Sequence, residues 1–190
     1  MVKIKNMERV WNYVHYNIYL FEVNASKIIG YPISLIFNLI YKISFISEGL
    51  KKRNSSRQEI RAARDNAINN RRYGQNITIA GIQMGGLLVL LEFSLFNLIQ
   101  AGIGKSLIQY VWGANNPIKW LFLIGFLLIP YLINNQLLWK NDKYLKYFKE
   151  FDKQPKEIRR KWALISFGII IGFILFFVLS CAIAIEVLHK

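Results

Sequence analysis

The sequence predicts an all-α membrane protein, a small polytopic bundle of four transmembrane helices with basic amphipathic helices at the membrane interface. Hydrophobic residues make up 54% of the 190-residue chain. They are concentrated in blocks of about 20 residues, the length that crosses about 30 Å of hydrocarbon. The net charge is +14, and the basic residues fall between the apolar blocks, as in the loops of membrane proteins. We therefore expect one membrane domain over residues 1–190.

Residues 8–24 are expected to form an amphipathic helix in the plane of the membrane surface. Trp11 and its apolar companions recur at helical spacing, and polar residues and tyrosines lie between them. Trp and Tyr side chains favour the headgroup region, which supports an interfacial position.

Residues 28–47 form the weakest candidate for a transmembrane helix. Ser34, Asn38 and Lys42 are spaced i, i+4 and i+8, so they share one stripe that should face protein rather than lipid. Lys42 lies close enough to the end of the block to reach the interface. If this segment crosses the membrane the chain has four spans, and if it forms a shallow or re-entrant hairpin the chain has three.

Residues 48–76 are expected to form a polar cytoplasmic loop, because they carry eight Lys and Arg residues. Ser56 and Glu59 match the S-x-x-E capping box, which predicts a helix over residues 57–70. Three basic residues are expected to contact anionic lipid headgroups: Lys51, Lys52 and Arg53.

Residues 77–99, 118–139 and 163–187 are the stronger transmembrane candidates, and the last of them is the most hydrophobic. Pro130 is expected to kink the second of these helices. The basic loops at both ends of the 77–139 hairpin then lie on the same, cytoplasmic side of the membrane.

Residues 140–162 form the second basic segment, with nine Lys and Arg against four acidic residues. Residues 142–153 are expected to form a basic interfacial helix, because aromatic residues recur there at helical spacing between lysines. Five residues of the segment are expected to contact anionic headgroups: Lys143, Lys146, Arg159, Arg160 and Lys161.

Glu92 is the strongest functional candidate, because a carboxylate inside a transmembrane segment is costly and must be paired, protonated or in use. At 100° per residue it shares a stripe with Gly81 and Gly85, and small residues let another helix approach closely. Lys42 is rejected as a partner, because the two residues differ in depth by about 15 Å at 1.5 Å per residue. Two hypotheses remain, a proton or cation relay and a contact that packs helices.

Gly168 and Gly172 form a G-x-x-x-G pattern in the last apolar block. The pattern is typical of helix–helix contacts in membranes, although glycine is common in such helices. We expect these residues to pack against a partner helix.

The sequence contains no catalytic motif and no set of metal ligands. Cys181 is its single cysteine and His15 and His189 its only histidines, and no cofactor is expected. Nucleic-acid binding is disfavoured, because lipid headgroups and membrane orientation explain the positive charge more simply.

Three function classes follow in order of preference. The first is a non-catalytic accessory or scaffold subunit that packs with other membrane subunits or with copies of itself. The second is an oligomeric protein that conducts protons or cations through Glu92. A membrane-embedded enzyme ranks last, because no acid or base converges near an interface.

Overall fold

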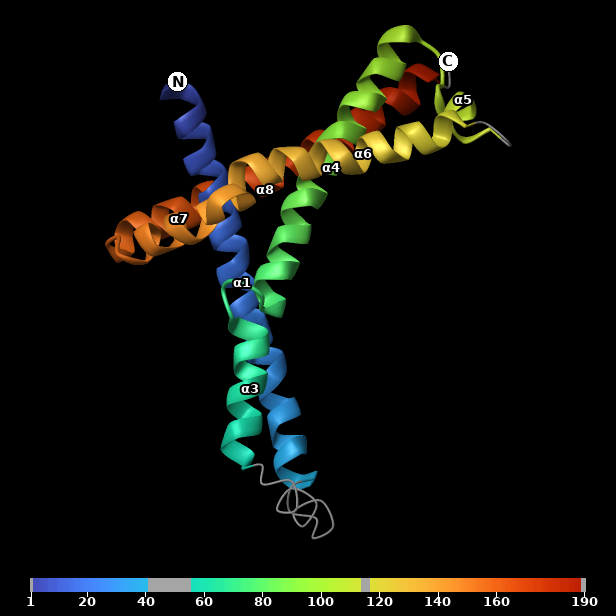
Figure 1. Cartoon of the computed structure of the whole chain (residues 1–190). Coiled ribbons are helices and arrows are strands. Elements are labelled where there is room, and N and C mark those ends of the chain that lie inside the picture. Colours follow the sequence, from blue (N-terminus) through green and yellow to red (C-terminus); the bar gives the residue numbers. More distant parts are fainter. Residues whose placement is uncertain (1, 41–55, 114–116, 189–190) are drawn as a thin grey trace. The chain divides into compact units, whose positions relative to one another are not determined.

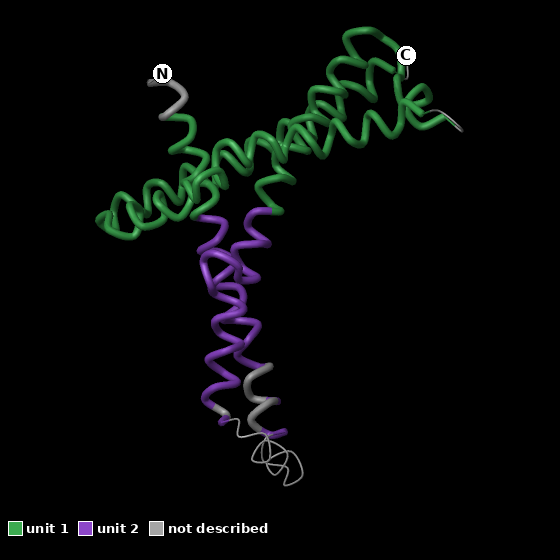
Figure 2. The backbone as a smooth tube through the Cα atoms, viewed as in Figure 1, with its two compact units in different colours: residues 1–16, 82–190 green, residues 17–81 purple. Residues whose placement is uncertain are grey.

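The computed structural model describes residues 2–40, 56–113 and 117–188. These residues are 91% helical and contain no strand, which confirms the all-α class. The chain divides into two compact units, one of residues 1–16 and 82–190 and one of residues 17–81 (Figure 2). Helices α1 (Val2–Ile40) and α4 (Gln75–Ile103) contribute to both units (Figure 1).

Within the described residues, three helices are long and apolar enough to cross a membrane. They are α4, the continuous helical stretch Ile118–Asp152 and α8 (Lys156–Leu188). These helices contain the three stronger apolar blocks of the sequence, which supports a membrane protein. The fourth predicted span falls on the end of α1 and on residues 41–47, which lie outside the described residues.

The stretch Ile118–Asp152 consists of four segments. They are α6 (Ile118–Asn134), the π-helix η1 (Asn135–Trp139), the 3₁₀-helix η2 (Lys140–Asp142) and α7 (Lys143–Asp152). Helix α6 continues through Pro130. A kink lies further along, where Asn141 and Asp142 adopt φ values of 60° and 53°. Asn and Asp tolerate this left-handed conformation better than most residues do.

In the larger unit, α4 packs on both α6 and α8. The Phe93 and Phe126 rings lie 4.6 Å apart between α4 and α6, and the Phe96 and Phe122 rings lie 5.0 Å apart. A polar contact joins α4 to α8, where Asn97 Nδ2 donates to Ser180 Oγ at 3.4 Å and to Cys181 Sγ at 3.2 Å. The short helix α5 (Ile108–Trp112) lies between α4 and α6 in sequence.

In the unit of residues 17–81, α3 (Arg57–Asn69) lies between α1 and α4 in sequence. Its first turn has both hydrogen bonds of the capping box that Ser56 and Glu59 predict. The buried Asn76 amide donates to Ser26 Oγ at 3.0 Å and to Asn69 Oδ1 at 2.9 Å, so one side chain joins all three helices.

Gly74 occupies the turn between α3 and α4. A Cβ atom at this position would lie 2.4 Å from the Asn70 carbonyl oxygen, which is shorter than any normal contact. Only glycine therefore fits this turn.

Candidate functional site

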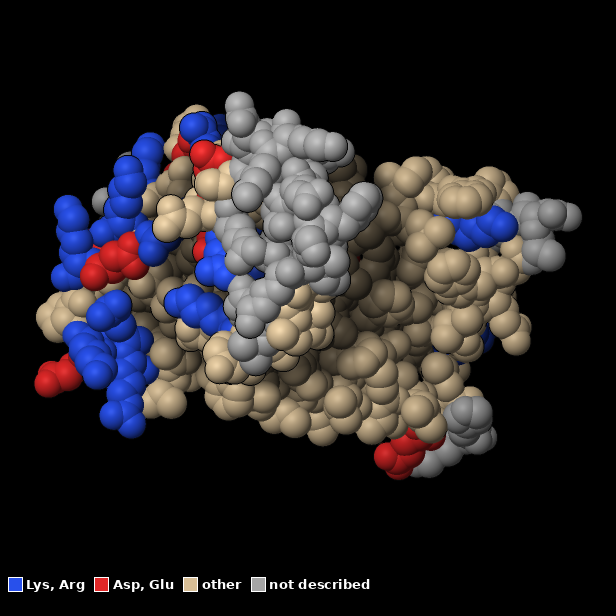
Figure 3. All heavy atoms as spheres, turned by 90° about the horizontal axis from the view of Figure 1, so that it is seen from below, with Lys and Arg blue, Asp and Glu red and all other residues tan. Residues whose placement is uncertain are grey.

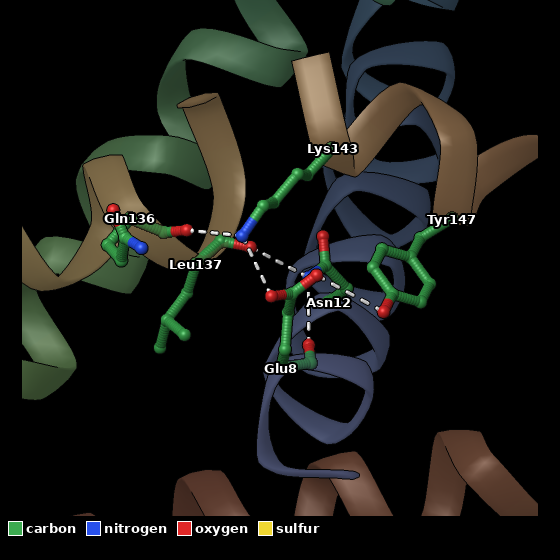
Figure 4. A network of polar contacts seen from close by, with 6 residues as sticks. All are labelled: Glu8, Asn12, Gln136, Leu137, Lys143 and Tyr147. Atoms are coloured by element: carbon green, nitrogen blue, oxygen red, sulfur yellow. Dashed lines mark hydrogen bonds and ion pairs between the residues drawn. The ribbon is translucent and has the colours of Figure 1, made fainter. Parts of the chain in front are cut away.

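The first part of α1 is held to η1 and α7 by a network of polar contacts (Figure 4). The Lys143 ammonium donates to Glu8 Oε2 and to the Gln136 carbonyl oxygen, both at 2.8 Å. The Tyr147 hydroxyl donates to the other Glu8 oxygen at 3.2 Å. The side chains of Glu8 and Lys143 are only 18% and 23% exposed, so this ion pair is partly shielded from water, although both residues border an open surface hollow.

The network also satisfies backbone carbonyls near the kink. A π-helix followed by left-handed residues interrupts the regular ladder of helical hydrogen bonds. The Asn12 amide donates to the Leu137 carbonyl oxygen at 3.0 Å. The Lys143 ammonium donates to the carbonyl oxygen of the preceding residue, Gln136. Side chains of α1 and α7 therefore stabilise the kink.

Next to this network, the Trp11 indole donates to Asn134 Oδ1 at 2.9 Å, and both residues are buried. The Trp11 ring also lies 6.2 Å from the Phe173 ring of α8. Trp11 thus contacts the end of α6 and the middle of α8 at the same time.

Aromatic stacking continues toward the start of α8. The Tyr13 ring is stacked between Phe151 and Trp162, with centroid distances of 3.6 Å and 4.2 Å, and its hydroxyl donates to Gln154. The Tyr16 hydroxyl donates to Asp152 Oδ1 at 2.7 Å. Burial, together with this hydrogen bond, raises the pKa of Tyr16 to about 12.

His15 is enclosed by the same aromatic cluster. It is 1% exposed, its ring lies 5.3 Å from Phe148 and 5.7 Å from Tyr144, and neither of its ring nitrogens has a hydrogen-bond partner among the described residues. Burial lowers the pKa of His15 to about 3, so the imidazole is neutral at physiological pH.

The two sequence-predicted interfacial helices contact each other in this cluster, α7 with its apolar face and α1 with the tyrosines and the histidine that lie between its apolar residues. Tyr144, Phe148 and Phe151 of α7 are buried, and they pack on residues 13–16 of α1. The interfacial positions of residues 8–24 and 142–153 stay predictions, although protein covers the aromatic face of α7 that lipid was expected to cover.

Glu92 lies inside the larger unit. Both of its carboxylate oxygens are enclosed, and neither has a hydrogen-bond partner among the described residues. On the same helix, Gly81 is buried, and the Cβ position of Gly85 lies 3.9 Å from Asn134 Nδ2. The stripe predicted from the helical wheel therefore faces α6 at Gly85, within the chain itself.

The G-x-x-x-G pair of α8 is exposed on the surface of the larger unit, whereas Gly81 is buried. Gly168 and Gly172 are exposed, and a Cβ atom at either position would have no neighbour within 4 Å. The buried positions of α8 are Ser166, Ser180 and Ala184 instead.

Basic residues gather at one end of the larger unit, over α7 and the start of α8, at the left of Figure 3. Lys146 lines a polar surface hollow of about 530 Å³ beside Arg9 and Glu150. Arg160 and Lys161 are exposed, whereas Arg159 is half-buried. Lys143 is engaged with Glu8, so the headgroup contact predicted for it competes with an internal ion pair. Lys51, Lys52 and Arg53 lie outside the described residues.

The arrangement holds the first part of α1 against η1, α7 and α8. The charged groups of the network are paired with each other or with the backbone, and no group of three potential metal ligands lies together in residues 2–40, 56–113 and 117–188. The contacts of Trp11, Asn12 and Asn134 were not predicted, because their one signal in the sequence is that polar residues stand next to apolar helix faces.

No protein-family model, no curated protein and no solved structure matches the chain.

Proposed function

We propose that the protein is a non-catalytic accessory or scaffold subunit that packs with partner transmembrane helices, either of other membrane subunits or of further copies of itself. The observation that carries this proposal is that, of the three described helices that could cross a membrane, the most apolar one is the least enclosed. Helix α8 has a mean hydropathy of 2.9 in its most apolar window, yet only 11% of that window is buried; the corresponding share for α4 is 33%.

Lipid alone would cover such a helix, but the exposed glycines favour a protein partner. The Cβ positions of Gly168 and Gly172 have open space around them, and glycine in contact with lipid contributes little packing. A second backbone can approach α8 closely at these two residues, where dispersion contacts and weak hydrogen bonds favour association.

Association is tested with the double variant Gly168→Leu/Gly172→Leu, purified in mild detergent and cross-linked in membranes. The wild-type chain should form a complex larger than its own 22.3 kDa, and the double variant should lose it. Gly125→Leu is the matched control, because Gly125 also has open space around its Cβ position but lies on α6. A wild-type chain that is monomeric both in detergent and in membranes rules the proposal out.

Glu92 supports the alternative, an oligomeric protein that conducts protons or cations. An enclosed carboxyl group without a partner is costly to ionise, and groups of this kind relay protons in membrane proteins. In proteoliposomes, Glu92→Gln should abolish proton flux, while Glu186→Gln near the end of α8 should not. Equal flux through the wild type and the Glu92 variant rejects this alternative.

For orientation, we propose that segments 48–76 and 140–162 face the cytoplasm, where their basic residues contact anionic headgroups. Single cysteines at exposed Lys149 and exposed Lys105 test this in a Cys181→Ser background. Residue 149 should react with an impermeant thiol reagent only after the cytoplasmic face is opened, and residue 105 should react in intact cells. The reverse pattern contradicts the orientation.

A further inference from the structure

The unit of residues 17–81 contains a cavity of about 520 Å³. It lies where α1, α3 and α4 meet, and its lining includes Ile29, Ile68 and Ile79. Asn76 and Asn69 also line it, and the hydrogen bond between them is already formed inside the unit. The cavity is therefore large enough for part of an amphiphilic molecule and has a substantial apolar wall.

Charged side chains of both signs line the same cavity. Lys27 and Arg64 supply two positive groups, and Glu22 and Asp65 supply two negative groups. Arg64 and Asp65 already form an ion pair with each other at 3.2 Å, which uses only one of the two carboxylate oxygens of Asp65. The cavity is thus balanced in charge, although the chain as a whole has a net charge of +14. A purely anionic ligand would meet two carboxylates, and a purely cationic ligand would meet two cations.

The position of the cavity indicates a membrane lipid. Gln75, Asn76 and Ile79 belong to the beginning of α4, one of the helices long enough to cross a membrane. Because the apolar block of α4 starts at residue 77, the cavity lies at the depth of the lipid headgroups if α4 crosses the bilayer. Its charged residues then meet a headgroup, and its isoleucines meet the first part of the acyl chains.

We propose that this cavity binds a phospholipid whose headgroup carries both a phosphate and a primary ammonium, as phosphatidylethanolamine does. Lys27 and Arg64 bind the phosphate, and Asp65 and Glu22 accept hydrogen bonds from the ammonium. Arg64 and Asp65 keep their own ion pair and contact the headgroup through the second terminal nitrogen of the guanidinium and the second carboxylate oxygen. A primary ammonium has three N–H donors, whereas the trimethylated headgroup of phosphatidylcholine has none. The proposal does not depend on the partner-binding function of α8, because the cavity belongs to the other unit.

The test is native mass spectrometry of the full chain in detergent, with lipids added singly. Phosphatidylethanolamine should bind with a Kd about fivefold lower than that of phosphatidylglycerol or phosphatidylcholine, a difference of about 1 kcal/mol. Inorganic phosphate and phosphoethanolamine alone should bind much more weakly, because they leave the apolar wall uncovered. Equal binding of all three lipids, or full-strength binding of free phosphate, overturns the proposal.

Two variants locate the site. Asp65→Asn should remove the preference for phosphatidylethanolamine over phosphatidylglycerol, whereas Glu157→Gln, an exposed acidic residue on α8, should leave it unchanged. Ala25→Trp should fill the cavity and reduce binding of every phospholipid, with circular dichroism confirming the helical content. An unchanged lipid preference in Asp65→Asn places the lipid elsewhere and overturns the proposal even if Ala25→Trp does not fold.

Discussion

The Trp11 indole donates a buried hydrogen bond to the Asn134 side chain across a sequence separation of 123 residues. Trp11→Phe keeps an aromatic ring near Phe173 but leaves Asn134 Oδ1 without a donor. We expect the variant to lose about 1–3 kcal/mol of unfolding free energy, the typical cost of a buried polar atom without a partner. The measurement is denaturation in detergent. Trp120→Phe serves as the control because Trp120 is 61% exposed, and equal losses in both variants contradict the prediction.

The partly shielded ion pair between Glu8 and Lys143 should stabilise the larger unit more than an exposed pair does. A double-mutant cycle with Glu8→Gln and Lys143→Met should give a coupling energy of about 1–3 kcal/mol. The control cycle uses Arg9→Gln and Glu150→Gln, because that pair is just as close at 2.7 Å but about half exposed. Its coupling energy should be about 0–1 kcal/mol, and similar values for the two cycles refute the role assigned to burial.

His15 should make the protein sensitive to acid. Its pKa is about 3 in the folded chain against an ordinary value of 6.5. Between these values the unfolded chain binds a proton that the folded chain does not bind, so the folded state loses stability as the pH falls from 6.5 toward 3. His15→Leu should flatten this dependence and raise stability at neutral pH, because it removes two buried nitrogens without partners. His189→Leu replaces the only other histidine of the sequence. It should change neither the pH dependence of stability nor the stability at neutral pH.

The left-handed conformation of Asn141 should restrict the residues accepted there. Asn141→Gly should keep or slightly increase stability, whereas Asn141→Val should cost about 1–2 kcal/mol or more, because a β-branched residue is strained at positive φ. Gln136→Val is the control, since Gln136 lies in the helical segment η1. The measurement is thermal unfolding in detergent. If the valine and glycine variants at this position are equally stable, the kink relaxes and the prediction is wrong.

The helices with the strongest local patterns are those that the sequence predicts well. Long apolar blocks identify α4, α6 and α8, and the capping box at Ser56 marks the start of α3, because hydropathy and capping depend on neighbouring residues. The kink at Asn141 has a weaker signal. Asn and Asp tolerate left-handed backbone, but they are also common in ordinary turns.

The packing of residues 8–16 on α7 could not be predicted in the same way. An amphipathic helix must cover its apolar face, and its sequence is similar whether lipid or another helix covers it. The surroundings of Glu92 could not be predicted from the sequence either. The helical wheel placed Glu92 on the stripe of Gly85, but only the fold shows that Gly85 faces Asn134 of the same chain.

The contacts of Tyr13 and Tyr16 have a consequence for synthesis of the chain. Tyr16 leaves the ribosome 136 residues before its partner Asp152, which corresponds to roughly 7–27 s at about 5–20 residues per second. For most of this interval no part of α7 is present to cover the tyrosines of α1. Tyrosine side chains favour the headgroup region of a membrane. Residues 13–16 therefore stay without their protein partners until α7 has been made, and the interfacial position that the sequence predicts for residues 8–24 would cover them during this interval.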